Sequence, residues 1–132
     1  MPTPAPGQLS DSQAAGIIAA FNTYFEGINS GNYAAAFAVL SPRIRAGLSE
    51  QSFADGDKTS YDTAPQILDA QAISSTRVVV DLAFNSVQAA DKGPDGDTCD
   101  NWTLAYTMIQ SPDGTWQIDG TAPYNGSEHT PC

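Results

Sequence analysis

The sequence predicts an α+β domain in which N-terminal helices pack on one face of a curved, mostly antiparallel sheet. Three observations predict it: helical spacing of apolar residues in the first part of the chain, alternation of apolar and polar residues in the second part, and turn-forming residues between the alternating segments. A chain of 132 residues has the size of one domain and can bury roughly two thirds of the surface of its unfolded form. We therefore expect a single core.

The first predicted helix begins near Asp11 and runs to about Ser30, because its apolar residues recur three or four positions apart. Gly31 is a typical helix stop, and an Ala-rich second helix follows it. Pro42 is placed as the first residue of a short third helix, and a further helical turn is expected before Gly56. The residues on the buried face of the first helix are Ile17, Phe21, Tyr24 and Ile28.

After Gly56 the period changes from helical to alternating. Residues 67–73 form a weakly patterned strand, residues 76–88 a clearly alternating one, and residues 89–100 a charged loop rich in turn formers. Two further alternating strands are joined by a Pro-Asp-Gly turn. The apolar faces comprise Val78, Val80, Leu82 and Phe84, then Trp102, Leu104, Tyr106 and Met108, and finally Trp116 and Ile118.

The net charge is −10, from fifteen acidic and five basic residues. Such a surface repels the phosphates of nucleic acid and of anionic membranes, which excludes these partners. No apolar run approaches the roughly 20 residues that span a bilayer, so we expect no membrane insertion by this segment. Neutral and cationic ligands remain compatible with the charge.

The two cysteines and the proline-rich start predict the organisation of the chain. Residues 1–9 contain Pro2, Pro4 and Pro6 and are interpreted as an extended linker or a remnant of expression, residues 10–124 as the domain, and residues 125–132 as a tail. Cys99 and Cys132 are expected to form a disulfide that tethers this tail. The protein is then secreted or extracytoplasmic, tethered as part of a longer polypeptide.

Three segments carry a resemblance to a known superfamily. YFEGINSGNY at residues 24–33, CDNWTLAY at 99–106 and GTWQID at 114–119 resemble secreted bacterial members of the NTF2-like (cystatin-like) and SnoaL-like superfamily. The resemblance covers about residues 10–120 and implies a cone whose sheet wraps the first helix and leaves a cavity at one end. Such domains occur as lipoproteins and as extracellular parts of membrane proteins, including serine/threonine kinases, and many relatives dimerise through the open sheet face. The fold also hosts isomerases, dehydratases and cyclases.

The resemblance offers one residue with a chemical role. Tyr24 matches the position where ketosteroid isomerases of this superfamily place a tyrosine whose hydroxyl stabilises an enolate. That reaction also needs a carboxylate base, and the sequence does not show whether Asp55, Asp57 or Asp62 takes its place. An aromatic residue at this helical spacing is also typical of a core position.

Asp69 is a second candidate base, and its orientation is open. Asp69 lies an even number of residues from Ile67 and Ile73, so its side chain faces the cavity if theirs do. The opposite phase, with Leu68, Ala70 and Ala72 inside, leaves Asp69 in water. Asp119 alternates away from Trp116 and Ile118 and is expected to be exposed.

No metal or cofactor site is predicted. Four aspartates in the predicted loop miss the spacing of an EF-hand, so a solvated turn is the better interpretation. His129 is the only histidine and lies in the polar tail, and both cysteines are expected to be oxidised, which leaves no zinc constellation and no catalytic dyad. The four aspartates are Asp91, Asp95, Asp97 and Asp100.

The sequence therefore favours a non-catalytic extracytoplasmic module that binds a small hydrophobic ligand in its cavity or a protein partner at its surface. The alternative is a cavity enzyme of isomerase, dehydratase or cyclase type acting on a hydrophobic carbonyl compound, with Tyr24 as hydrogen-bond donor and Asp69 as base. A third hypothesis is an interaction surface over a filled cavity. The expected ligand-binding residues are Tyr24, Phe25, Trp102, Tyr106 and Trp116.

Overall fold

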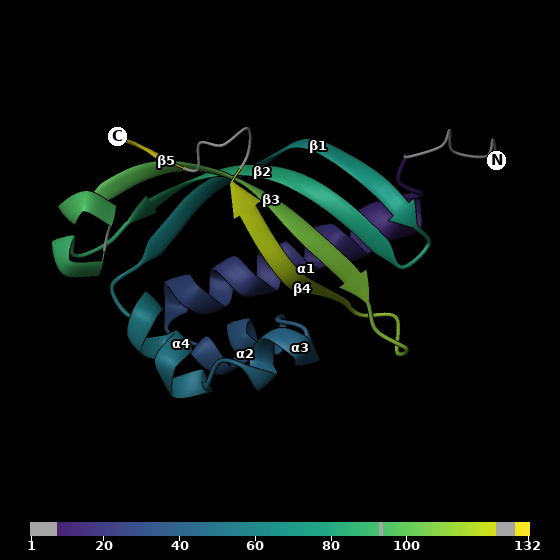
Figure 1. The fold of residues 1–132 in the computed structure, drawn as a ribbon, viewed down its shortest axis with the longest axis horizontal. Coiled ribbons are helices and arrows are strands. Elements are labelled where there is room, and N and C mark those ends of the chain that lie inside the picture. The colour runs from purple at the N-terminus through teal and green to yellow at the C-terminus, as the bar shows by residue number, and fades with distance from the viewer. Residues whose placement is uncertain (1–7, 93, 124–128) are drawn as a thin grey trace.

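The computed structural model describes residues 8–92, 94–123 and 129–132. Residues 1–7 of the expected linker and 125–128 of the expected tail lie outside them. An arched antiparallel sheet covers a long helix, and three short helices lie on the opposite side of that helix (Figure 1). The predicted α+β class and element order are observed.

The long helix α1 (Asp11–Ser30) is capped at both ends by local sequence. Ser10 Oγ accepts a hydrogen bond from the Gln13 amide at 3.1 Å, and the Ser10 amide donates to Gln13 Oε1 at 2.9 Å, which forms a capping box. Gly31 ends the helix with φ +79°, a conformation that favours glycine. Its buried face contains Ile17, Phe21 and Ile28, as predicted, together with Phe25, whereas Tyr24 is half-buried.

The short helices α2 (Tyr33–Ala38), α3 (Pro42–Ala46) and α4 (Glu50–Asp57) follow in sequence. The side chains of Asn32, Ser41 and Ser49 each accept a hydrogen bond at the respective N-terminus. Because these helices are too short to be stable alone, they depend on packing against α1 and the sheet. They close one side of the molecule (Figure 1).

The sheet contains β1 (Tyr61–Ser74), β2 (Arg77–Val87), β3 (Cys99–Gln110) and β4 (Trp116–Pro123) in that order, all antiparallel. The predicted loop before β3 contains the short 3₁₀ turns η1 (Ala90–Lys92) and η2 (Pro94–Gly96). A three-residue strand, β5 (His129–Pro131), pairs with the start of β3, where β4 does not reach. β1 begins six residues before the predicted start at residue 67, and three residues of the expected tail form β5.

The core lies between α1 and the concave face of the sheet. Val78, Val80 and Met108 are fully buried, as the alternation predicts. Gly16 allows Trp116 to approach α1 closely, because a Cβ at this position would collide with the indole Cδ1. The turn between α2 and α3 is attached to β4 through two backbone hydrogen bonds of 2.8 Å that flank the Leu40 and Ile118 bridge.

Asp119 corrects one expectation, since it is only 8% exposed. It is the extra residue of an irregularity in the pairing of β4 with β3, which turns its side chain towards α3. Its Oδ1 accepts hydrogen bonds from Ser41 Oγ at 2.7 Å and Arg43 Nε at 3.2 Å. Burial acts to raise the pKa of Asp119, but these donors and the charge of Arg43 outweigh it and lower the pKa.

Cys99 and Cys132 form a disulfide, with their Cα atoms 5.3 Å apart. The Cys132 amide also donates to the Cys99 carbonyl at 3.1 Å, so the end of the chain is attached to the first residue of β3. Within the described part of the chain, no helix is long and apolar enough to cross a membrane.

Candidate functional site

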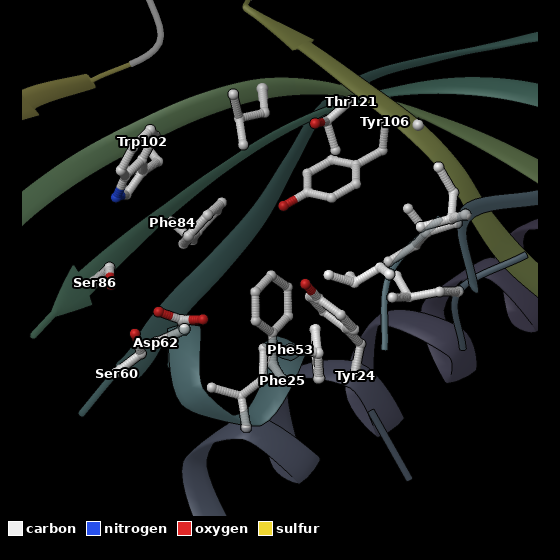
Figure 2. A pocket seen from close by; sticks show the side chains of 18 of the residues that line it. Tyr24, Phe25, Phe53, Ser60, Asp62, Phe84, Ser86, Trp102, Tyr106 and Thr121 are labelled. Carbon is white, nitrogen blue, oxygen red and sulfur yellow. The ribbon is translucent and has the colours of Figure 1, made fainter. Parts of the chain in front are cut away.

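A cavity of about 450 Å³ lies between the C-terminal half of α1, α4 and the concave face of the sheet (Figure 2). Pockets that bind small molecules commonly have volumes of this order. The cavity is not filled by side chains, so the filled cavity of the third hypothesis is not observed, while its interaction surface stays a prediction.

Aromatic side chains from three elements form much of the cavity wall. Tyr24 and Phe25 come from α1, Phe84 from β2, and Trp102 and Tyr106 from β3 (Figure 2). The Phe25 and Phe84 ring centroids are 5.2 Å apart, and Phe84 stacks on Trp102 at 6.5 Å. The alternation in β2 and β3 places these rings on the concave face, so the wall suits a flat apolar molecule.

The hydroxyl groups of Tyr24 and Tyr106 both point into the cavity (Figure 2). They are polar groups in a largely apolar wall, positioned to contact a polar atom of a molecule inside it. Tyr24 is partly buried and Tyr106 is 4% exposed, so both rings are held by packing.

The carboxyl group of Asp62 lies at one end of the cavity, near Ser60 and Ser86 (Figure 2). Asp62 is 9% exposed, and burial raises the pKa of this carboxyl above its usual range, while a hydrogen bond with Ser86 acts in the opposite direction. The Asn29 side chain attaches the Asp62 backbone to α1: Asn29 Nδ2 donates to the Asp62 carbonyl and the Asp62 amide donates to Asn29 Oδ1, both at 2.7 Å. The carboxyl is therefore well positioned.

A chain of hydrogen-bonded polar side chains adjoins Asp62. Gln88 Nε2 donates to the Asp97 carbonyl at 2.9 Å and to Asp100 Oδ2 at 3.0 Å, which fixes the orientation of the amide. Gln88 Oε1 accepts from Ser86 Oγ at 2.8 Å. Ser86 thus connects this chain to the Asp62 carboxyl, whose pKa burial raises more than the Ser86 hydrogen bond lowers it.

A family model described as a domain of unknown function, DUF4864, matches residues 10–128. The chain belongs to this family. No curated protein matches the DUF4864 chain.

The fold of the DUF4864 chain is similar to solved structures of NTF2-like proteins. A ketosteroid isomerase-like protein from Erwinia carotovora atroseptica is 18% identical with TM-score 0.59, over 85% of this chain and 95% of that one. An NTF2-like family protein from Streptomyces avermitilis is 14% identical with TM-score 0.56, over 86% and 95%. A cystatin-like domain of unknown function from Nostoc punctiforme is 14% identical with TM-score 0.61, over 86% and 76%. The predicted NTF2-like fold is confirmed.

The structure brings most of the expected ligand-binding residues together. Tyr24, Phe25, Trp102 and Tyr106 all line the cavity. Trp116 does not, because β4 turns it towards Gly16 on the other side of the core, where it lines a separate shallow hollow. Trp116 is thus a core residue that is 3% exposed.

Asp69 lies in water on β1 and does not line the cavity, so it cannot act as a base there. Ala70 and Ala72 pack against the core, as in the second of the two phases that the sequence allows. Leu68, expected inside in that phase, is 48% exposed, because it lies in the register shift between Ile67 and Asp69. Among the other candidates, Asp55 is exposed. The only one of the proposed aspartates whose carboxyl reaches the cavity, within the described part of the chain, is Asp62.

Sequence reasoning did not single out Asp62 among Asp55, Asp57 and Asp62, because irregular pairing hides its phase. The pairing of β1 with β2 shifts between Thr63 and Gln66 and again between Ile67 and Asp69, and each shift inserts one extra residue. Two insertions restore the original phase, so Asp62 faces the same side as Ala70. The only signal in the sequence for the orientation of Asp62 is that it lies an even number of residues before Ala70, which packs against the core.

Proposed function

We propose that this DUF4864 domain binds a small, flat, mostly apolar molecule whose one polar group faces Asp62. The observation that carries the proposal is a cavity of about 450 Å³ with aromatic walls and a buried carboxyl at one end. Apolar pockets with a few positioned polar groups are typical small-molecule sites. The names of NTF2-like neighbours, which include a ketosteroid isomerase-like protein, support a cavity-based role.

The charges around the site limit the class of ligand. A net charge of −10 disfavours anions, and the raised pKa of Asp62 favours its neutral form, which donates a hydrogen bond instead of presenting a negative charge. Carbonyl and hydroxyl groups are acceptors that fit such a donor. The ligand is therefore a neutral molecule with a carbonyl or hydroxyl group on an apolar ring system.

Calorimetric titration with 2-naphthol, a flat molecule with one hydroxyl group, tests the proposal. Leu48 lines the cavity, whereas Leu68 is 48% exposed on β1 and lies outside it. Leu48→Trp fills the cavity and should weaken binding at least tenfold, while Leu68→Trp, the same change elsewhere, should leave it unchanged. Absence of binding to the unaltered protein, or equal binding by both variants, would overturn the proposal.

Catalysis is the second candidate, and the raised pKa of Asp62 favours it. A carboxyl with a raised pKa is suited to proton transfer near neutral pH, and Tyr24 offers a hydroxyl to a substrate oxygen in the same cavity. In this role ionised Asp62 removes a proton from the carbon beside a carbonyl, and Tyr24 stabilises the enolate. Asp62 replaces Asp69, the base that the sequence offered.

Deuterium exchange separates catalysis from binding. If the domain catalyses enolisation, it should accelerate exchange of the α-protons of 2-tetralone in D₂O, followed by NMR, and Asp62→Asn should remove the acceleration. Asp69→Asn, the same change on the exposed face, is the matched control. Binding of the ketone without accelerated exchange would leave the binding role alone.

An extracytoplasmic location, tethered within a longer polypeptide, is part of the proposal and is supported by the disulfide between Cys99 and Cys132. Such bonds persist in oxidising compartments. Fractionation of cells that express the full-length protein, followed by thiol counting, tests it. Recovery of reduced protein in the cytosol would contradict this location.

A homodimer through the open face of the sheet is the proposed assembly. Tyr61 and Val87 lie opposite each other in the pairing of β1 with β2 and are 55% and 50% exposed, which provides apolar surface there. Light scattering should give twice the chain mass, and Val87→Asp should give the monomer mass. A monomer for the unaltered protein would refute this assembly.

A further inference from the structure

A second cluster of polar side chains lies at the opposite end of β3 from β4. Asp95, Asp97 and His129 each present one potential ligand atom, and these atoms all lie within 4.8 Å of one another. The cluster joins the loop before β3 to β5, two segments more than thirty residues apart. His129 Nε2 lies 3.7 Å from Asp95 Oδ2, and the His129 ring packs on Trp102 with centroids 5.0 Å apart.

Asp100 adds a buried carboxylate to this cluster. It is fully buried, and its carboxyl is within hydrogen-bonding reach of the Asp97 carboxyl. One oxygen, Oδ2, accepts from Gln88 Nε2 at 3.0 Å, but Oδ1 has no hydrogen-bond partner among the described residues. Asp97 Oδ2 is likewise buried without a donor in the described part of the chain. A buried carboxylate oxygen without a donor is costly, and two facing carboxylates repel each other.

A cation resolves both problems at once, because it supplies positive charge to oxygens that lack donors. The Cys99–Cys132 disulfide holds β5 in place and so keeps His129 beside the aspartates. The fold thus holds Asp95, Asp97 and His129 around one point, with the buried Asp100 carboxyl next to Asp97.

We propose that Asp97, Asp100 and His129, together with Asp95, bind a divalent transition-metal ion of the zinc class. An imidazole nitrogen combined with carboxylate oxygens is a donor set that zinc accepts, whereas calcium and magnesium take oxygen ligands. The ion would link β5 to the loop before β3 beside the disulfide. The sequence conceals this site, because its histidine lies 29 residues after the last aspartate.

Calorimetric titration of the oxidised protein with zinc chloride, after treatment with a chelator, tests the proposal. We expect one ion per chain, and His129→Ala should weaken binding at least tenfold. Asp100→Asn should weaken it similarly. Asp91→Asn is the matched control, since Asp91 is exposed in the same loop and does not belong to the cluster. Circular dichroism without metal checks that each variant is folded, and His129→Ala, which alters a partly exposed side chain, keeps the test informative if Asp100→Asn does not fold.

A second readout locates the ion. Cobalt(II), a paramagnetic substitute for zinc, should quench the fluorescence of Trp102, and His129→Ala should remove the quenching. Failure of zinc to bind would overturn the proposal. Zinc binding that is unchanged in His129→Ala would also overturn it. The same holds if Asp91→Asn weakens zinc binding as much as Asp100→Asn does. Calcium binding that is independent of His129 would also contradict a site of the zinc class.

Discussion

Removal of the disulfide should produce the largest single loss of stability. The perturbation is the double variant Cys99→Ser, Cys132→Ser. The bridge joins residues 33 positions apart, and the chain-entropy model for a loop of this length gives about 3.8 kcal/mol at 25 °C. Few native contacts would hold the end of the chain in place without the bridge, because β5 has only three residues and its Thr130 and Pro131 are exposed. Since small domains are stable by roughly 5–15 kcal/mol, the variant should lose a large fraction of its stability.

Urea unfolding measures this loss. The midpoint should fall, and the m-value should rise, because the unfolded chain expands when the bridge is absent. Hydrogen exchange of the double variant should show lost protection in β5 while α1 keeps its protection, since only β5 depends on the bridge for its position. A loss below about 1 kcal/mol with an unchanged m-value would refute the argument that the bridge acts by restraining the unfolded chain.

Three further substitutions have distinct expected outcomes. Asp62→Asn should raise the melting temperature at pH 7, because the raised pKa of Asp62 makes its ionisation costly in the folded state. The gain should disappear below about pH 4, where the carboxyl is neutral in the folded and the unfolded state. A constant gain in thermal melts from pH 3 to 8 would contradict this. Asp119→Asn should lower the free energy of unfolding in urea by about 1.5–3 kcal/mol at pH 7, since Ser41 and Arg43 donate to the charged carboxylate. This loss should shrink as the pH falls through the lowered pKa of Asp119. A loss that persists at pH 2 would show that the ionised carboxylate is not its origin. Gly27→Ala should destabilise the protein in the same assay, because the added Cβ would lie 2.9 Å from backbone atoms. The overpacking costs about 1–3 kcal/mol, which exceeds the roughly 1 kcal/mol gained in helix propensity. Gly56→Ala, at a position with open space around it, should stabilise the protein, and a similar gain for Gly27→Ala would disprove the close contact.

The elements that the sequence predicts well are those whose signals are local. α1 carries its own capping box and glycine stop, and β2 has one buried face, so its alternation gives the strand and its orientation. The aromatic cavity wall followed from the same periodicities, which place Phe25 and Trp102 on buried faces. Trp116 followed the same rule, but alternation does not distinguish a cavity wall from a filled core.

The features that the sequence does not predict depend on contacts between distant segments. The phase of Asp62 depends on two irregularities in the pairing of β1, one of them beside Pro65, and no local pattern marks them. β5 is too short to carry a period, and it forms because the disulfide and the packing of His129 on Trp102 hold it against β3. Both candidate sites therefore depend on the regions where periodicity is weakest.

The two candidate sites are connected through one amide. Gln88 donates to Asp100 in the cluster and accepts from Ser86 beside the cavity, so the acceptor in the cluster fixes which end of the amide faces Ser86. Ser86 in turn contacts the Asp62 carboxyl, where its hydrogen bond lowers the pKa of Asp62 while burial raises it by more. Replacement of Gln88 by Glu would remove the donor to Asp100 and add a charge between two carboxyls. The protonation of the cavity carboxyl is thus coupled, through Ser86 and Gln88, to a buried carboxyl at the start of β3.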